Sequence, residues 1–551
     1  MPLEYFYHWE RTTPERVFLT QPVGGGRVRD ITWREAGDEV RRIAAWLKAQ
    51  GWPRGSKVAI LGKNSAHWVL ADFAIMMAGY VSVPMYSTFN ADALRYILEH
   101  SESRACFIGK LDDTGSLAAG IPAGLPVVVL PLAPPVEGIA WDALVAATAP
   151  LTGNPVPSPD DLWTIVYTSG TTGRPKGVML GFGGLKWAAG PSLRRLPITG
   201  TDRFLSYLPL AHIMERVVLE MTAVHYGCHL FFAESLDTFL ADLQRARPTV
   251  FLSVPRLWVK FQQGVHSKIP PAKLARLLRI PVVGRLVRRR ILKGLGLEHC
   301  RFAGSGAAPL PPDVLRWYRN LGLDLLEGYG MTENFAISHA ILPGTSHPGT
   351  VGVPYTGVES RIDPETGEVQ MRSPAVMLGY YKEPQLTAAA FTADGWLRTG
   401  DKGVLDAHGN LRITGRVKDI FKTSKGKYVA PAPIEDLLVT HAAVEACVVT
   451  GANLAQPLAL LMLSAEAMAR ARGDGRDALA ASLEAHLRAV NERLDHHEKL
   501  DCLAVTTTLW TPENGFVTPT LKVKRARIEE AYGEHYERWV GERRTVVWAE
   551  V

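Results

Sequence analysis

A segment rich in glycine and hydroxyl side chains, YTSGTTGRPKG at residues 167–177, constrains the fold of this chain more than any other. The apolar run TIVY precedes it and VML follows it, so the sequence predicts a loop after a buried strand. Glycines let backbone N–H groups approach an anion closely, and hydroxyls and a lysine add donors. The segment predicts a phosphate-binding loop, with a flexible surface turn as the alternative. Its candidate phosphate ligands are Thr168, Ser169, Gly170, Thr171, Thr172 and Lys176.

The segment differs from a Walker A loop. That motif requires Gly-Lys followed by Ser or Thr. Here Arg174 and Pro175 separate the last of the preceding glycines from Lys176, and Gly177 follows the lysine. The sequence therefore indicates phosphate binding by another kind of loop.

Composition limits the class of protein. A chain of 551 residues with 47% apolar residues predicts more than one packed domain. The five cysteines form no CxxC pair, which argues against a zinc site or a disulfide framework and favours a reducing cytoplasm. The first residues include early acids and no long apolar core, and no later segment has about 18 uninterrupted apolar residues, so we expect neither secretion nor a membrane span. A net charge of +6 suits anionic nucleotides without indicating nucleic-acid binding.

The order of helical and strand patterns predicts an α/β fold. A helical pattern at residues 35–50 stops at Gly51, the strand-like KVAIL follows at 57–61, and a second helical pattern covers 64–78. Such alternation is typical of parallel α/β layers. After Gly415 the chain becomes lysine-rich and later helical, which predicts a separate small domain.

Residues 272–296 carry many arginines among Leu, Val and Ile, with a break at Pro281. A basic amphipathic helix of this kind can lie on an anionic membrane surface. Helices that cover a core and present solvated cations have the same pattern. The two interpretations are peripheral contact with the inner membrane and an ordinary surface helix pair.

Further motifs resemble those of the adenylate-forming superfamily, which includes acyl-CoA synthetases, nonribosomal-peptide adenylation domains and luciferases. Residues 167–177 resemble its phosphate-loop signature. The resemblance continues in order through LPLAHIMER (208–216), AGSGAAPL (303–310), EGYGMTE (327–333), RTGD (398–401), GRVKD (415–419) and TPTLKVKR (518–525). Seven motifs that occur in the family's order along nearly the whole chain do not arise by chance.

The resemblance implies a large N-terminal adenylate-forming domain of several subdomains and a small, mobile α+β C-terminal domain. The expected boundaries are residues 1–415, a hinge at 416–419 that contains Lys418, and 420–551. Such a C-terminal domain rotates between two catalytic steps, and the second step would present residues 423–429 to a thiol.

A nucleotide site needs a stacking face, a phosphate donor and a metal ligand, and EGYGMTE supplies all three residue types. The resemblance assigns Tyr329 to adenine, Thr332 to the α-phosphate and Glu333 to Mg²⁺. It also assigns Asp401 to the ribose hydroxyls and Arg416 to the ribose or a phosphate, although an Asp after Gly is usually a turn residue. The expected backbone wall of the adenine slot consists of Gly304, Ser305, Gly306, Ala307 and Gly328.

Two residues are expected near the reacting carboxylate. In relatives the counterpart of His212 lies between the phosphates and the acyl pocket, although a His among apolar residues is often a packing residue. Lys522 would bridge the carboxylate and the α-phosphate as a mobile point charge. Leu521 stands where many relatives have glycine, so Lys524 remains a rival, and a solvated basic patch is the structural alternative.

The expected activity is ATP- and Mg²⁺-dependent conversion of a medium- to long-chain fatty acid to acyl-AMP, followed by thioester formation with CoA. Segments 89–112, 422–435 and 514–525 resemble bacterial long-chain fatty acid–CoA ligases. The acyl pocket is expected to be lined by the residues after His212 and those around 254–261, where Trp258 is either a pocket wall or a core residue. The alternatives are a fatty acyl-AMP ligase that loads a carrier protein and a non-catalytic relative that binds nucleotide or fatty acid.

Overall fold

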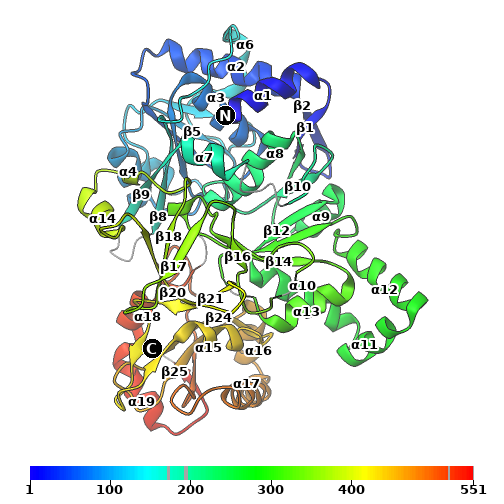
Figure 1. The fold of residues 1–551 in the computed structure, drawn as a ribbon, viewed down its shortest axis with the longest axis vertical. Helices are drawn as coiled ribbons and strands as arrows, with labels where there is room; N and C mark the ends of the chain where they lie inside the picture. Colours follow the sequence, from blue (N-terminus) through cyan, green and yellow to red (C-terminus); the bar gives the residue numbers. More distant parts are fainter. Residues whose placement is uncertain (170–173, 191–195, 309, 346, 519–521, 550–551) are drawn as a thin grey trace.

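The computed structural model describes most of the chain, namely residues 1–169, 174–190, 196–308, 310–345, 347–518 and 522–549. Figure 1 shows a large N-terminal part above a smaller C-terminal part, which is coloured yellow to red. Helices and strands alternate through both parts, so the predicted α/β fold is confirmed.

The main sheet of the N-terminal part has a parallel centre and an antiparallel edge. The strands from β8 through β4, β3, β5 and β6 to β7 run parallel, whereas β9 and β19 are antiparallel to their neighbours. KVAIL forms β3, and its last four residues are buried because helices cover the sheet. The spatial order is β19 (Gly379–Tyr380), β9 (Pro175–Gly181), β8 (Leu162–Ser169), β4 (Val81–Met85), β3 (Lys57–Leu61), β5 (Cys106–Ile108), β6 (Val127–Val129) and β7 (Ile139–Ala140).

Both helical patterns of the early chain form helices. The first is α2 (Trp33–Ala49), which begins with a capping box between Thr32 and Glu35. The second is α3 (Ala66–Ala78), whose residues are all buried because the helix is packed on every side. The other N-terminal helices include α1 (Pro2–Thr12), α4 (Ala91–His100), α5 (Leu117–Gly120), α6 (Trp141–Ala147), α7 (Phe182–Ala188), α8 (Thr222–Tyr226), α9 (Phe239–Ala246), α10 (Pro255–Lys268), α11 (Pro271–Arg279), α12 (Pro281–Gly294), α13 (Pro312–Leu321) and α14 (Pro384–Ala389).

Three further sheets complete the N-terminal part. The first is β10 (Arg203–Ser206), β11 (His229–Phe232), β1 (Val17–Pro22) and β2 (Val28–Thr32). The second is β12 (Val250–Ser253), β13 (Phe302–Ser305), β14 (Leu325–Tyr329), β15 (His339–Ala340) and β16 (Val353–Pro354). The third is antiparallel and consists of β17 (Glu359–Ile362), β18 (Glu368–Arg372), β20 (Leu397–Leu405) and β21 (Leu411–Arg416).

The C-terminal part has its own hydrophobic cores, whose buried members all come from residues 429–549. Helices pack on a sheet of β24 (Val444–Thr450), β25 (Leu458–Leu463), β26 (Leu503–Thr506) and β27 (Val546–Ala549). A small hairpin, β22 (Phe421–Lys422) and β23 (Tyr428–Val429), precedes this sheet. The helices are α15 (Pro431–Leu438), α16 (Ala465–Arg472), α17 (Arg476–Asn491), α18 (Arg525–Tyr532) and α19 (Tyr536–Gly541).

No helix in the described ranges is both long and apolar enough to cross a bilayer.

Candidate active site

The predicted phosphate loop is shorter than its sequence pattern suggests, because the strands on either side extend into it. Strands β8 and β9 pair in antiparallel register, with Thr168 opposite Lys176. A Cβ on Gly177 would lie 2.8 Å from Ile165 Cγ2 and 3.1 Å from Tyr167 Cζ, so side chains of the facing strand require glycine there. Of the predicted ligands, Gly170, Thr171 and Thr172 lie outside the described residues.

Lys176 and Glu333 meet through a tyrosine that the sequence did not single out. The Lys176 ammonium lies 5.6 Å from the centroid of the Tyr380 ring. The Tyr380 hydroxyl donates to Glu333 Oε1 at 2.8 Å. Tyr380 lies on β19, which pairs with β9, so this edge pairing brings the phosphate loop to the candidate metal ligand. An aromatic pair such as Tyr380-Tyr381 has no distinctive sequence signal of function.

The EGYGMTE motif spans β14 and the 3₁₀ turn η3 (Thr332–Asn334). A Cβ on Gly330 would lie 2.3 Å from the Ala336 carbonyl carbon, so only glycine allows this close approach of two backbone segments. Thr332 is buried, and the Glu333 carbonyl accepts from Met377 N–H at 2.8 Å. The turn thereby fixes the backbone positions of Thr332 and Glu333 after β14.

The candidate ribose ligands are joined to the candidate adenine ligand. The Tyr329 hydroxyl donates to Asp401 Oδ2 at 2.6 Å, and Arg416 Nε lies 2.9 Å from Asp401 Oδ1. Asp401 on β20 and Arg416 on β21 are register partners. Burial, followed by the negative charge of Asp401, raises the pKa of Tyr329 well above its ordinary value. Tyr329 therefore keeps its proton and remains a donor.

The AGSGAAPL motif begins on β13, between β12 and β14. A Cβ on Gly306 would lie 3.3 Å from the Gly328 carbonyl oxygen, and Ala307 has a left-handed φ of 69°. Small residues are thus needed where this strand leaves the sheet. The carbonyl of Gly304 accepts from the indole N–H of Trp258 at 3.3 Å.

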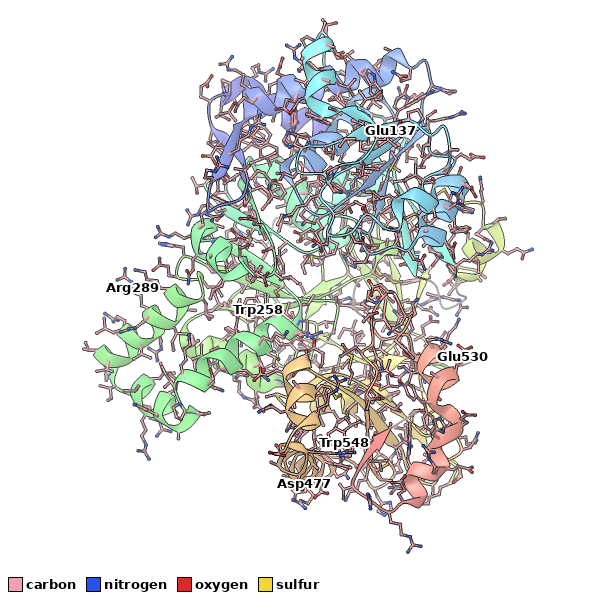
Figure 2. All side chains as sticks on the ribbon, turned by 180° about the vertical axis from the view of Figure 1, so that it is seen from behind. Glu137, Trp258, Arg289, Asp477, Glu530 and Trp548 are labelled. Atoms are coloured by element: carbon pink, nitrogen blue, oxygen red, sulfur yellow. The ribbon has the colours of Figure 1, made fainter. Side chains whose placement is uncertain are left out.

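Trp258 packs in the core behind this strand. Its side chain is fully buried, and its ring lies 5.0 Å from Tyr318 and 5.5 Å from Phe251 between centroids. The Tyr318 hydroxyl also donates to the Trp258 carbonyl at 2.7 Å. Figure 2 labels Trp258 where the green helices join the rest of the N-terminal part. These contacts show the core role that the sequence left as one of two interpretations.

Two buried polar atoms on neighbouring strands have no protein partner in the described part of the chain. They are Ser305 Oγ on β13 and Glu327 Oε2 on β14, whose residues are register partners. The other carboxyl oxygen of Glu327 accepts from Leu310 N–H at 3.0 Å. Burial raises the pKa of Glu327 to about 7. Unpartnered polar atoms at the predicted adenine wall suit a ligand that supplies hydrogen bonds.

His212 lies in a turn that buried polar residues hold in place. Its Nδ1 accepts from Met214 N–H at 3.2 Å, which puts the ring proton on Nε2. Glu215 is fully buried and accepts from Ser206 Oγ at 2.8 Å and from Tyr207 N–H at 3.0 Å. Burial, and then the charge of Lys522, lower the pKa of His212 to about 4. His212 is therefore neutral near pH 7.

Lys522 reaches the N-terminal site from the C-terminal part. Its backbone exchanges hydrogen bonds with Thr518, from Thr518 N–H to the Lys522 carbonyl at 2.8 Å and from Lys522 N–H to Thr518 Oγ1 at 3.1 Å. Part of its side chain is open to water, yet desolvation and then the Arg416 charge lower its pKa. Asp401 and Glu333 are close enough to act in the opposite direction. Lys524, the rival lysine, is the N-cap residue of α18.

The predicted hinge lies in a turn directly after β21. Lys418 is exposed there, Val417 N–H donates to the Gly400 carbonyl at 2.9 Å, and Asp419 pairs with Arg525 at 3.8 Å. The Gly400 contact fixes one side of the turn to the N-terminal part, while the Arg525 contact fixes the other to the C-terminal part.

The described residues contain no group of three or more His, Cys, Asp or Glu side chains that could hold a metal alone. Mg²⁺ commonly uses one or two carboxylates together with substrate phosphates and water. Glu333, close to Lys176, fits this donor set for a metal that binds with a nucleotide.

Known families and structures match nearly the whole chain. A family described as AMP-binding enzyme matches residues 6–381, and one described as AMP-binding enzyme C-terminal domain matches residues 418–539. The chain is 32% identical to the long-chain-fatty-acid–CoA ligase FadD15 of Mycobacterium bovis, covering 96% of this chain and 95% of that protein. It is also 32% identical to the peroxisomal long chain acyl-CoA synthetase 6 of Arabidopsis thaliana, covering 92% and 82%.

Among solved structures, the adenylation domain of a carboxylate reductase from Mycobacterium chelonae is similar, with a TM-score of 0.82 and 25% identity. That match covers 98% of this chain and 91% of the other. An anthranilate CoA ligase shares the fold, with a TM-score of 0.80 at 22% identity and coverage of 97% and 98%. The ordered motifs, their meeting around Tyr329, Asp401 and Lys522, and these matches agree. The chain belongs to the family of AMP-binding enzymes.

Proposed function

We propose that this chain is an ATP-dependent long-chain fatty acid–CoA ligase that forms AMP. The observation that carries the proposal is the position of Lys522, which comes from the C-terminal part and lies within electrostatic range of Glu333, Asp401 and His212. Relatives named long-chain-fatty-acid–CoA ligase and long chain acyl-CoA synthetase match along nearly the whole chain, which supports the same substrate class here.

In the first step, a carboxylate oxygen of the fatty acid attacks the α-phosphorus of ATP, and pyrophosphate leaves. The two reactants are both anionic, so the site must offset their repulsion. Lys522 would lie between the carboxylate and the α-phosphate, while Thr332 would donate to the α-phosphate. His212, neutral and protonated on Nε2, can donate to an oxygen that gains charge.

The nucleotide would bind where the unpartnered polar atoms lie. Tyr329 would stack on adenine while its hydroxyl holds Asp401, and Asp401 would accept from the ribose hydroxyls. Lys176 would pair with the outer phosphates. Glu333 would hold Mg²⁺, which would supply charge neutralisation beside the phosphates.

The second step requires another arrangement of the two parts. The thiol of CoA attacks the acyl carbonyl carbon, AMP leaves, and the thiol proton passes to solvent. We assign residues 1–415 and 420–551 to two domains, with a hinge at 416–419. The separate core of the C-terminal part and the exposed Lys418 turn support this division. Rotation would withdraw Lys522 and bring residues 423–429, with exposed Tyr428, to the adenylate.

The cysteines support a reducing, cytoplasmic environment. Cys106, Cys228, Cys300, Cys447 and Cys502 are free, and all except Cys300 are buried. Thiols that stay reduced are typical of cytoplasmic proteins.

The test is a turnover assay with ATP, Mg²⁺, CoA and straight-chain acids from acetate to oleate, in which AMP, pyrophosphate and thioester are measured together. We expect equal amounts of all three with the longer acids. Pyrophosphate without thioester would contradict CoA as the acceptor, and an absence of turnover with every acid would contradict the proposed substrate class.

A further inference from the structure

Helices α11 and α12 form a hairpin that projects from the side of the N-terminal part (Figure 1). The chain turns at Ile280 and Pro281, and Gly284 N–H donates to the Ile280 carbonyl at 2.6 Å. A Cβ on Gly284 would lie 2.6 Å from the Leu278 carbonyl oxygen, so glycine lets the two helices meet closely. The hairpin therefore has a tight, defined tip.

One apolar face anchors the hairpin to the body. Leu274 on α11 is 2% exposed and Ile291 on α12 is 8% exposed, and both belong to the core that includes β12, β13 and β14. Leu278 and Val287 pack against the same core. The inward apolar residues thus account for the stability of the hairpin.

A second apolar set points away from that core. Val282 is 73% exposed and Leu286 is 63% exposed, one turn apart on α12, and Ile280 beside them is 50% exposed. Exposure of these aliphatic side chains to water is unfavourable, and an exposed apolar group at a projecting tip is typical of an interaction surface. These side chains are not needed to anchor the hairpin.

The surface around the tip is strongly cationic. Residues 271–296 contain no Asp or Glu. Arg288 donates to the Asn320 carbonyl at 2.8 Å, which leaves seven exposed cations. Within the described chain, none of the seven makes an ion pair, and Figure 2 shows Arg289 at the outer edge of the hairpin. They are Lys273, Arg276, Arg279, Arg285, Arg289, Arg290 and Lys293.

We propose that the α11–α12 hairpin docks on an anionic phospholipid bilayer. Val282 and Leu286 enter the boundary between headgroups and acyl chains, while the surrounding cations contact lipid phosphates. Charge complementarity and exposed aliphatic groups together select this partner. A nucleic acid or another soluble polyanion would use the cations but would leave the aliphatic tip without a role.

Helix α10 links the hairpin to the candidate site, because Trp258 on α10 donates to the carbonyl of Gly304. Helix α10 begins near the contact between the two parts, where Arg256 pairs with Glu445, and ends just before α11. At 1.5 Å per residue, α10 is about 21 Å long. If the proposed function holds, docking would connect a bilayer, through α11 and α10, to the site that consumes its fatty acids.

Flotation of the full chain with vesicles tests the docking. Vesicles of phosphatidylcholine alone are compared with vesicles that also contain phosphatidylglycerol, at low salt and without substrates. We expect at least tenfold tighter binding to the anionic vesicles, since each surface cation contributes about fivefold. Equal binding to both vesicles, or no binding to either, would overturn the proposal.

Two double variants separate the charged and apolar contributions. Arg289→Gln with Arg290→Gln should weaken binding more than tenfold, and Val282→Ser with Leu286→Ser should do the same because apolar burial is lost. The matched controls lie outside the hairpin: Leu236→Ser, at an 89% exposed position, and Arg538→Gln, at an exposed position of α19. Both controls should bind within about twofold of the unmodified chain, well below the fivefold effect of one surface cation.

Binding of the Val282/Leu286 variant as tight as that of the unmodified chain would contradict the proposed entry of these side chains into the bilayer. The cations would then be expected to bind a soluble polyanion. Thermal unfolding should show that every variant is folded. The flotation assay needs no ATP, so its result does not depend on ligase activity. Turnover of a short, water-soluble acid, measured separately, should be unchanged in the hairpin variants.

Discussion

The surroundings of Lys522 and His212 set the protonation behaviour of each residue in a different way. Lys522 lies near Arg416 and loses solvent, which lowers its pKa, yet the carboxylates of Asp401 and Glu333 oppose that shift. His212 is held by a backbone N–H at Nδ1, and burial keeps it neutral. One residue is a mobile charge and the other is a fixed donor.

Replacement of Lys522 by alanine should reduce acyl-adenylate formation about 10²–10³-fold, the usual effect of removing one group that stabilises developing charge. Exchange of labelled pyrophosphate into ATP measures this step. Thioester formation from supplied acyl-AMP should change little, since the proposed rotation would withdraw Lys522 in that step. Lys524→Ala is the matched control, and an equal loss in that variant would contradict the choice of Lys522.

His212 should titrate far below its ordinary pKa of 6.5, at about 4. Because folding lowers the pKa, neutral His212 favours the folded state above pH 6.5, and this contribution is lost as the pH falls toward 4. Urea unfolding at several pH values, compared with His212→Asn, measures the difference. A histidine resonance that titrates near pH 6.5 and disappears in the variant would contradict the shift.

Helix α3 and the π-helix η2 (Glu215–Met221) share a charged contact in the core of the N-terminal part. Arg216 is fully buried and donates to Asp72 at 2.6 Å and 2.7 Å and to Thr164 at 2.8 Å. Its guanidinium lies 4.2 Å from the Trp163 ring centroid. Irregular helices of this type often occur at functional sites, and this one follows the His212 turn directly.

Two of the three buried acids around Arg216 are neutral, which explains how the core accommodates them. Burial raises the pKa of Glu215 to about 8, and burial and the nearby Asp72 raise that of Glu220 well above its ordinary value. Both groups therefore keep their protons near pH 7, while Asp72 pairs with Arg216. The cluster is close to electrically neutral.

Arg216→Met should destabilise the N-terminal part by about 3–5 kcal/mol, because it leaves Asp72 buried without its partner. The midpoint of urea unfolding, followed by tryptophan fluorescence, measures the loss. Adding Asp72→Asn should recover a large part of that stability, since the uncompensated charge is then removed. Equal stability of the single variant and the unmodified chain would show that the pair is not important for folding.

At the scale of the molecule, the contact between the two parts contains acids as well as an ion pair. Asp436 on α15 lies near Glu327 on β14, and Arg256 on α10 pairs with Glu445 on β24. Burial, followed by the charges of Glu435 and Glu327, raises the pKa of Asp436 to about 7. Protonation of Asp436 therefore favours the contact between the two parts.

The contact between the N-terminal and C-terminal parts should weaken as the pH rises. The Glu327 charge raises the pKa of Asp436 only while the two parts are in contact, so protonated Asp436 favours the contact at low pH, and this contribution is lost as the pH rises through about 7. Energy transfer between dyes on the two parts should decrease from about pH 6 to about pH 8. Asp436→Asn should remove much of this dependence, and an unchanged dependence in that variant would assign it to other groups.

Short-range sequence patterns correctly predicted individual helices and strands. The strand-like 57–61 segment and the helical patterns at 35–50 and 64–78 match β3, α2 and α3, because periodicity and caps act over a few residues. The motifs also led to the correct family. The strands that extend into the phosphate loop were not predicted, since their pairing overrides the local signal from glycine.

The tertiary structure alone decided which distant residues meet. The Tyr329–Asp401 hydrogen bond joins positions 72 residues apart, and the Arg216–Asp72 pair joins positions 144 apart. Tyr380 joins Glu333 and Lys176 because β19 pairs with β9. The sequence by itself determined the family and the residue types of the site. Packing decided their contacts and pKa shifts, because burial and neighbouring charges depend on segments that sequence patterns do not relate.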